Sequence, residues 1–252
     1  NAPIGVYDSG FGGLSVWREL HRALPCESLI YLGDGKNCPY GSQSVERIKQ
    51  LAEESVRELV RRGCKMVVVA CNTATAAAIT HLRERFSQIP IVGLEPAVKP
   101  ACQMTKSRKV AVVATERSLG SEKFRSAVER YGEGVEVIKA VGEGFVEAVE
   151  SDQEQSPATR QKVEAVIEPL IKSGVDVIVL GCTHYPFLKS VIRNVVGERG
   201  VQIIDSGEAV EKRVESLLDK YDIRASEEND AQYEFLTFAD DDYRERLRRK
   251  AF

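Results

Sequence analysis

Short apolar runs alternate along this chain with longer segments in which apolar residues recur every three or four positions. The short runs predict buried strands, and the longer segments predict amphipathic helices. No hairpin signal joins successive strands, so the pattern predicts parallel β/α units with a site at the carboxyl ends of the strands. The predicted strands are 4–7, 29–32, 66–70, 89–94, 110–115, 135–138, 175–180, 201–204 and 233–238. The predicted helices are 14–24, 44–63, 73–85, 118–131, 157–172 and 240–249, with a further helix after 175–180 and after 201–204.

The chain also contains an internal repeat. The apolar run and polar turn of 67–74 have a near copy in 177–184, and Cys71 matches Cys182 at an offset of 111 residues. At this offset Leu59 matches Leu170, Val60 matches Ile171 and Val92 matches Ile203, and at an offset of 106 Val6 matches Val112 and Ser9 matches Thr115. A single repeat over so long a distance predicts two duplicated halves and not a solenoid.

The predicted fold class is therefore α/β, with two similar parallel-sheet β/α domains related by pseudo-two-fold symmetry. We expect residues 1–97 and about 207–252 to form the first domain and residues 98–206 to form the second. Similar halves pack in the way that the subunits of an isologous dimer do. The active site is then expected in the cleft between the domains, where Cys71 and Cys182 would approach a ligand from opposite sides.

Composition narrows the function classes. The 252 residues carry a net charge of -3, which argues against a nucleic-acid-binding surface. No apolar run approaches the roughly 18 residues that span a bilayer, and the N-terminal residues lack the profile of a signal peptide. The six cysteines form no Cys-x-x-Cys pair and no zinc-like spacing with histidine. We expect a cytoplasmic protein with free thiols, no metal and no membrane contact.

The two matched cysteines suggest the chemistry. A lone cysteine at a strand end is more often a small buried apolar residue, but Cys71 and Cys182 are each followed by polar residues. A thiol requires only a modest fall of its pKa from about 8.5 to act as a base near neutral pH. A thiolate on one face of a carbon atom and a thiol on the other can remove a proton from one side and return one to the other. Such a pair inverts a stereocentre.

Polar neighbours of the two cysteines fit this task. Asp8 ends the first strand and is expected beside the cleft, although a helix N-cap is the alternative role for it. His184 follows Cys182 by two residues and can influence that thiol. Short donors at helix starts favour an anion, and they are Asn72, Thr73 and Thr183. The glycine-rich turn 10–13 lacks both GxGxxG and the Walker lysine, so it is only a weak phosphate-loop signal.

Five segments, in order over nearly the whole chain, resemble the motifs of bacterial glutamate racemase and, more broadly, of the cofactor-independent aspartate and glutamate racemases. They are Asp8–Gly13 (DSGFGG), Pro39–Gly41 (PYG), Ala70–Ala74 (ACNTA), Glu95–Ala97 (EPA) and Leu180–Pro186 (LGCTHYP). The resemblance implies interconversion of L- and D-glutamate without pyridoxal phosphate or metal, to supply D-glutamate for peptidoglycan.

The same resemblance implies roles for individual residues. Cys71 would take the α-proton from D-glutamate and Cys182 from L-glutamate, with Asp8 and His184 as auxiliary catalytic residues. Glu150 aligns best with an auxiliary glutamate of the family, and Glu147 is the competing choice. The substrate contacts implied are Asp8, Ser9, Pro39, Tyr40, Gly41, Ser42, Asn72, Thr73, Thr115, Thr183 and His184.

Other functions stay open at this point. An aspartate racemase or a racemase of another amino acid differs in pocket length, which the sequence does not give. A two-lobed ligand-binding protein with redox-sensing cysteines would bind without turnover. A metal-dependent hydrolase would require more ligands than a single suitable histidine. The expected partners are the small-molecule substrate and a second copy of the chain in a homodimer.

Overall fold

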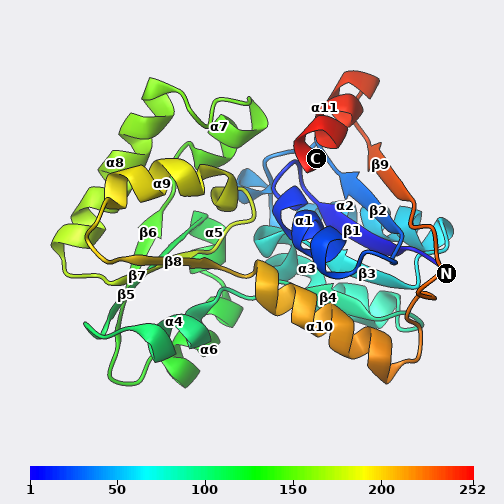
Figure 1. Ribbon diagram of the computed structural model, residues 1–252, viewed down its shortest axis with the longest axis horizontal. Helices are drawn as coiled ribbons and strands as arrows, with labels where there is room; N and C mark the ends of the chain where they lie inside the picture. Colours follow the sequence, from blue (N-terminus) through cyan, green and yellow to red (C-terminus); the bar gives the residue numbers. More distant parts are fainter. The chain divides into compact units, whose positions relative to one another are not determined.

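The computed structural model covers residues 1–252 and forms two compact units (Figure 1). The first unit contains Asn1–Leu94 and Gly207–Phe252, and the second contains Glu95–Ser206. Each unit is built on a single sheet in which every strand pairing is parallel. The predicted α/β class with two parallel sheets is confirmed.

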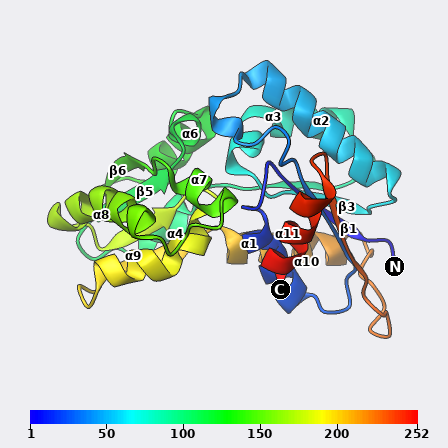
Figure 2. The same cartoon turned by 90° about the horizontal axis from the view of Figure 1, so that it is seen from above.

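The first unit has a five-stranded sheet with the order β4-β3-β1-β2-β9. Its strands are β1 (Ile4–Asp8), β2 (Leu29–Gly33), β3 (Met66–Val69), β4 (Ile91–Gly93) and β9 (Tyr233–Thr237). Its helices are α1 (Leu14–Ala23), α2 (Val45–Arg61), α3 (Asn72–Arg85), α10 (Gly207–Lys220) and α11 (Asp241–Ala251), with the 3₁₀ turn η1 (Tyr40–Ser42). Helices α2 and α3 cover one face of the sheet, and α1, α10 and α11 cover the other (Figures 1 and 2). Both faces are covered, so β1 to β3 are buried throughout, and Asp8 at the end of β1 is their one charged residue.

The second unit has a four-stranded sheet with the order β6-β5-β7-β8. Its strands are β5 (Lys109–Ala114), β6 (Glu136–Val141), β7 (Val177–Leu180) and β8 (Gln202–Asp205). Its helices are α4 (Val98–Met104), α5 (Glu116–Leu119), α6 (Glu122–Tyr131), α7 (Phe145–Glu150), α8 (Pro157–Lys172) and α9 (Lys189–Val196), with the 3₁₀ turn η2 (Tyr185–Leu188). The helix predicted over 118–131 is wrong in one respect, because Ser121 divides it. The Ser121 hydroxyl accepts a hydrogen bond from the Phe124 N–H and starts α6 as its N-cap.

The internal repeat is visible in the strand order. The sequence β4-β3-β1-β2 in the first unit corresponds to β8-β7-β5-β6 in the second. The predicted match of Val92 with Ile203 is wrong by one residue. Val92 pairs with Val68, whose equivalent Val179 pairs with Ile204. The connection between β7 and β8 is thus one residue longer than the connection between β3 and β4. The extra residue lies in the connection and not in the strand, where a one-residue slip would turn every side chain to the opposite face of the sheet.

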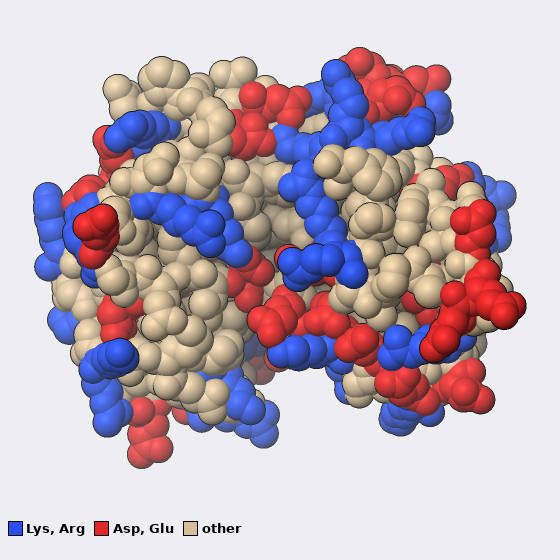
Figure 3. All heavy atoms as spheres, viewed as in Figure 1, with Lys and Arg blue, Asp and Glu red and all other residues tan.

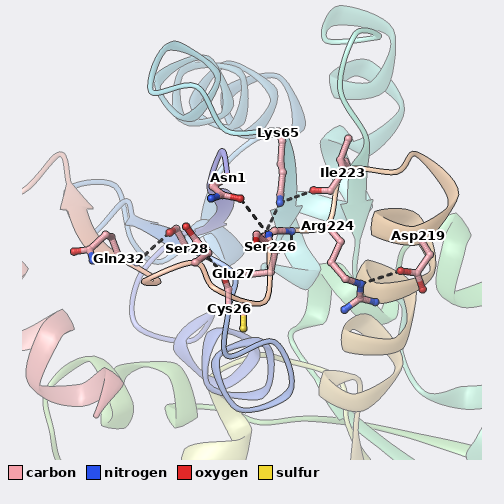
Figure 4. A network of polar contacts seen from close by, with 12 residues as sticks. Asn1, Cys26, Glu27, Ser28, Lys65, Asp219, Ile223, Arg224, Ser226 and Gln232 are labelled. Atoms are coloured by element: carbon pink, nitrogen blue, oxygen red, sulfur yellow. Dashed lines mark hydrogen bonds and ion pairs between the residues drawn. The ribbon is translucent and has the colours of Figure 1, made fainter.

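A buried polar network lies at the amino ends of the strands in the first unit (Figure 4). Lys65, which precedes β3, is 2.6 Å from the carboxylate of Glu27 and donates to the Ile223 carbonyl at 2.6 Å. The other Glu27 oxygen accepts from the Ala225 N–H at 2.7 Å. The network therefore holds the segment between α10 and β9 against the amino ends of the strands, whereas Asp8 lies at a carboxyl end.

The surface carries charges of both signs. Acidic and basic side chains are interspersed on the face shown in Figure 3, and basic ones gather near α11 with acidic ones beside them. In that helix Arg244 pairs with Asp241 at 3.0 Å. The basic residues of α11 are thus part of a helix surface that carries both charges. None of the helices has the length and apolar character that crossing a bilayer demands.

Candidate active site

Both matched cysteines lie at the carboxyl ends of interior strands. One residue separates Cys71 from the end of β3, and one residue separates Cys182 from the end of β7. Both are buried, with 4% and 7% of their surface exposed. We call the first group the Cys71 cluster, defined by Asp8, Ser9, Cys71, Asn72 and Thr73. The second is the Cys182 cluster, defined by Thr115, Glu150, Cys182, Thr183 and His184.

Cys71 is the N-cap of α3. Its sulfur accepts a hydrogen bond from the Ala74 N–H at 3.4 Å, as a serine or threonine hydroxyl does at other helix starts. Its S–H can donate to the Ser9 hydroxyl 3.6 Å away. A backbone N–H and the positive end of the helix dipole both stabilise negative charge on this sulfur. The contacts therefore suit a thiol that must ionise.

Asn72 supplies an unsatisfied donor beside Cys71. The side chain is 6% exposed, and its Nδ2 atom is buried without a hydrogen-bond acceptor in the protein. A buried amide without a partner costs about 1–3 kcal/mol. Asn72 is also the first residue of α3, and Thr73 is the second. The start of this helix thus offers an unpaired amide next to backbone N–H groups, a combination that fits a carboxylate.

Asp8 is fully buried at the end of β1. Its Oδ2 accepts from the Gly10 N–H at 3.0 Å, so the carboxylate closes a turn and does not cap α1, which starts after Gly13 without a side-chain cap. A Cβ on Gly13 would lie 2.6 Å from the Cβ of Asp8. The glycine is therefore required for the close approach of this turn to the aspartate.

The predicted contacts of the PYG segment lie on and beside η1. Tyr40 is 1% exposed, and its hydroxyl is engaged inside the protein, so only its backbone is available to a ligand. A Cβ on Gly41 would meet no atom within 4 Å, and open space therefore adjoins this residue. Pro39 and Ser42 are exposed, and the Ser42 hydroxyl donates to the Pro39 carbonyl at 3.4 Å.

In the Cys182 cluster, a histidine connects the cysteine to a carboxylate. Nδ1 of His184 is 3.8 Å from Sγ of Cys182, and Nε2 is 2.6 Å from Oε1 of Glu150. An ionised carboxylate only accepts, so Nε2 carries the proton and Nδ1 presents its lone pair toward the thiol. His184 is 3% exposed. This arrangement can take a proton from sulfur and return it.

The short helix α7 brings Glu150 to His184. Phe145, its first residue, packs edge-on against Tyr185 with ring centroids 5.1 Å apart. The Tyr185 hydroxyl donates to the Gly142 carbonyl at 3.1 Å. A Cβ on Gly142 would lie 2.5 Å from that hydroxyl, so this contact requires glycine. Glu147, one turn earlier on α7, is exposed. Of the two glutamates, Glu150 is therefore the one that contacts the histidine.

Thr115 and Thr183 complete the Cys182 cluster. Thr115 is the N-cap of α5, where its hydroxyl accepts from the Ser118 N–H at 3.3 Å and donates to the Ser118 hydroxyl at 2.9 Å. Thr183 is 5% exposed and directly follows Cys182. Both threonines thus lie at carboxyl ends of strands, β5 and β7, in the second unit.

The repeat places different groups beside its two cysteines. At the offset of 111, His184 is the equivalent of Thr73, and at the offset of 106 Ala114 is the equivalent of Asp8. The Cys71 cluster therefore has a buried aspartate and a helix N-terminus, whereas the Cys182 cluster has a histidine and a glutamate. Different polar groups therefore surround the two thiols.

Another buried cysteine has a different environment. Cys64 precedes β3 at the amino end of the strand, and burial raises the pKa of its thiol to about 12. It stays protonated at neutral pH and packs in the core of the first unit. Its position and its raised pKa fit a structural role in the core.

Comparison with known proteins agrees with this picture. Residues 4–213 match the family described as Asp/Glu/hydantoin racemase. The chain is 46% identical to a glutamate racemase of Ectopseudomonas mendocina over 226 residues, 90% of this chain and 86% of the relative. A glutamate racemase isoform of Bacillus anthracis has a TM-score of 0.87 at 35% identity and covers 98% of this chain and 92% of its own. Escherichia coli glutamate racemase, solved with L-glutamate and an activator, has a TM-score of 0.87 at 29% identity, with 100% and 96% covered.

The family match and the glutamate racemases among the relatives place the protein in the class of amino-acid racemases. The match covers most of the chain, and the chain belongs to the Asp/Glu/hydantoin racemase family.

Proposed function

We propose that the protein is a glutamate racemase, which interconverts L- and D-glutamate with Cys71 and Cys182 as its two acid–base groups. The observation that carries this proposal is the pair of buried cysteines at equivalent strand ends, each with polar groups that can stabilise or exchange a proton. The relatives at 42–49% identity are glutamate racemases, which supports glutamate as the substrate. Its product would supply D-glutamate for peptidoglycan synthesis in the cytoplasm.

The reaction requires one base and one acid on opposite faces of the α-carbon. Cys71, as thiolate, takes the α-proton of D-glutamate, and the resulting carbanion takes a proton from the Cys182 thiol. The product is L-glutamate. After this step Cys71 is a thiol and Cys182 is a thiolate. The reverse reaction starts from that state. Because the two thiols supply both acid and base, the proposed cycle uses neither pyridoxal phosphate nor a metal ion.

Each thiol has its own support in this scheme. On the Cys182 side, Nδ1 of His184 accepts the thiol proton, and Glu150 stabilises the imidazolium that results. On the Cys71 side, the Ala74 N–H stabilises the thiolate and Ser9 accepts from the thiol. Asp8, buried at the end of β1, is the carboxylate we assign to orient the substrate or to move a proton.

The α-hydrogen of an amino acid is very weakly acidic, so charge that develops in the transition state must be stabilised. Oriented amides and hydroxyls in a buried site provide the largest such effect. We assign this role to the unpaired Asn72 amide, to Thr73 at the start of α3, and to Thr183. Ser9, Thr115 and the turn Pro39–Ser42 are assigned as further contacts to the substrate.

The test is incubation of metal-free protein with L-glutamate, followed by circular dichroism. The proposal predicts loss of optical activity, and aspartate at the same concentration should be converted far more slowly. Cys71→Ser and Cys182→Ser should each reduce racemisation by about 10³-fold or more, because serine does not ionise near neutral pH. Preferred turnover of aspartate would assign the other substrate, and glutamate binding without turnover would favour a ligand-binding protein.

A further inference from the structure

Three buried side chains in the first unit form a hydrogen-bonded chain that the proposed reaction does not use. The Tyr7 hydroxyl donates to the Tyr40 hydroxyl at 2.8 Å, and the Tyr40 hydroxyl donates to Oδ2 of Asp34 at 2.7 Å. Tyr7 and Asp34 are fully buried, and Tyr40 is 1% exposed. The Asn37 amide also donates to both carboxylate oxygens, at 2.9 and 3.0 Å. The carboxylate is thus satisfied by neutral donors.

The two phenols act as fixed donors. Burial, and then the charges of Cys71 and Asp34 with Asp8, raise the pKa of Tyr7 well above its usual value. Burial, Tyr7 and Asp34 raise the pKa of Tyr40 beyond its usual range in the same way. Both hydroxyls therefore keep their protons at any working pH. A group that does not lose its proton is no general base. Both hydroxyls already donate to partners inside the protein, which fits a positioning role.

The chain joins the carboxyl ends of two strands to the η1 turn. Tyr7 belongs to β1 and Asp34 directly follows β2, whereas Tyr40 starts η1. The turn packs beside α3, and Tyr7, Tyr40 and Cys71 belong to a single core cluster. Within the turn, Gly41 and Ser42 are exposed and the Gln43 N–H bonds the Tyr40 carbonyl at 3.1 Å. The Tyr40 side chain is thus the buried anchor of an otherwise exposed turn.

We propose that Tyr7, Tyr40 and Asp34 are positioning residues that hold the backbone of the Pro39–Ser42 turn at a fixed place relative to Cys71, so that the turn can bind the substrate. This inference rests on the proposed function, in which that turn contacts glutamate. In this arrangement the Tyr40 hydroxyl bonds only Tyr7 and Asp34, and the backbone of Tyr40 and Gly41 contacts the substrate. Asp34 and Tyr7 thereby gain a role in substrate binding although neither lies on the turn.

Tyr40→Phe and Tyr7→Phe test the inference in graded form. The first variant removes both hydrogen bonds of the central hydroxyl, and the second removes only the bond at the far end of the chain. We expect KM for glutamate to rise about 10-fold in Tyr40→Phe and about threefold in Tyr7→Phe, with kcat changed less than about threefold in both. Hydrogen exchange of the Gly41 and Ser42 amides, measured on the free protein, should accelerate in the same order.

Lys65→Gln is the matched control, because it weakens the buried Glu27 network at the opposite edge of the same sheet. This variant should have a lower melting temperature, while KM for glutamate and the hydrogen-exchange rates of the Gly41 and Ser42 amides stay at the values of the unmodified protein. The inference is overturned if KM in Tyr40→Phe stays within about twofold of the unmodified value, or if Lys65→Gln raises KM as much. Failure of the unmodified protein to racemise glutamate would instead overturn the proposed function, and the exchange experiment would still report whether the chain anchors the turn.

Discussion

The Nε2 atom of His184 lies 2.6 Å from Oε1 of Glu150, and this contact turns the other ring nitrogen toward Cys182. The two residues are 34 positions apart and meet because α7 packs on η2. A carboxylate that fixes the tautomer of a histidine increases its basicity toward the group on its far side. The contact thus makes the histidine the natural partner of the Cys182 thiol.

Replacing Glu150 should expose this dependence. In Glu150→Gln the amide no longer carries a negative charge that stabilises the imidazolium, and kcat/KM should fall by about 10- to 100-fold. L- and D-glutamate have equal free energy, so kcat/KM must fall equally in both directions. Polarimetric rates from each enantiomer measure this. Glu147→Gln is the matched control on the exposed side of α7, and an equal loss in that variant would contradict the assignment.

Asn72 should show opposite effects on stability and activity. Asn72→Ala removes a buried amide that has no partner in the free protein, so the melting temperature should stay the same or rise by up to about 4 °C. The same change should lower kcat/KM by about 10- to 100-fold, because the substrate loses a hydrogen bond. Thr75→Ala is the contrast on α3. Its hydroxyl bonds the Val69 carbonyl and the Leu94 N–H, so that variant should melt at a lower temperature. A large loss of stability in Asn72→Ala would show that the amide is structural.

A substitution at Gly41 tests whether the substrate occupies the space beside the turn. A methyl group there meets no protein atom within 4 Å, so Gly41→Ala should change the free energy of unfolding by less than about 0.5 kcal/mol. If the substrate lies against this residue, KM should rise about 10-fold or more, since small displacements of bound groups are costly. Gly63→Ala should behave in the opposite way. Its φ of +79° is strained for alanine, so stability falls while KM is unchanged. Unaltered KM in Gly41→Ala would remove this residue from the site.

The sequence predicted the strands well because buried parallel strands are short, apolar and bounded by polar turns. It did not predict α4 or α7, since helices of seven and six residues show less than two turns of periodicity. That omission left the choice between Glu147 and Glu150 open, because α7 decides which glutamate faces His184. The chain from Tyr7 to Asp34 was also missed. The available signal was Asp34, a polar residue directly after β2 that resembles Asp8 at the end of β1, but side-chain contacts across 33 residues of sequence follow only from the fold.

Acid stability should depend on Asp176 in the second unit. Burial opposes ionisation of this carboxyl, but hydrogen bonds from the Thr105 hydroxyl and from the Lys106 and Ser107 amides outweigh it and lower its pKa to about 2. The depressed value means that the stabilisation is complete above the ordinary pKa of 3.8 and is lost as the pH falls toward 2. Asp176→Asn should therefore reduce stability at pH 6 by on the order of 1 kcal/mol and flatten the melting temperature between pH 4 and about pH 2. An unchanged profile would contradict this.

Solvent isotope incorporation is the strongest test of the proposal that Cys71 and Cys182 act on opposite faces of one α-carbon. L-glutamate is incubated with the protein in heavy water, and both enantiomers are separated at about 10% conversion and analysed by mass spectrometry. If one thiol removes the proton and the other delivers a solvent-derived one, the D-glutamate formed carries deuterium at the α-carbon. The remaining L-glutamate keeps its original hydrogen. Deuterium that enters the remaining L-glutamate faster than D-glutamate is formed would show that one base serves a single face, and would contradict the two-thiol account.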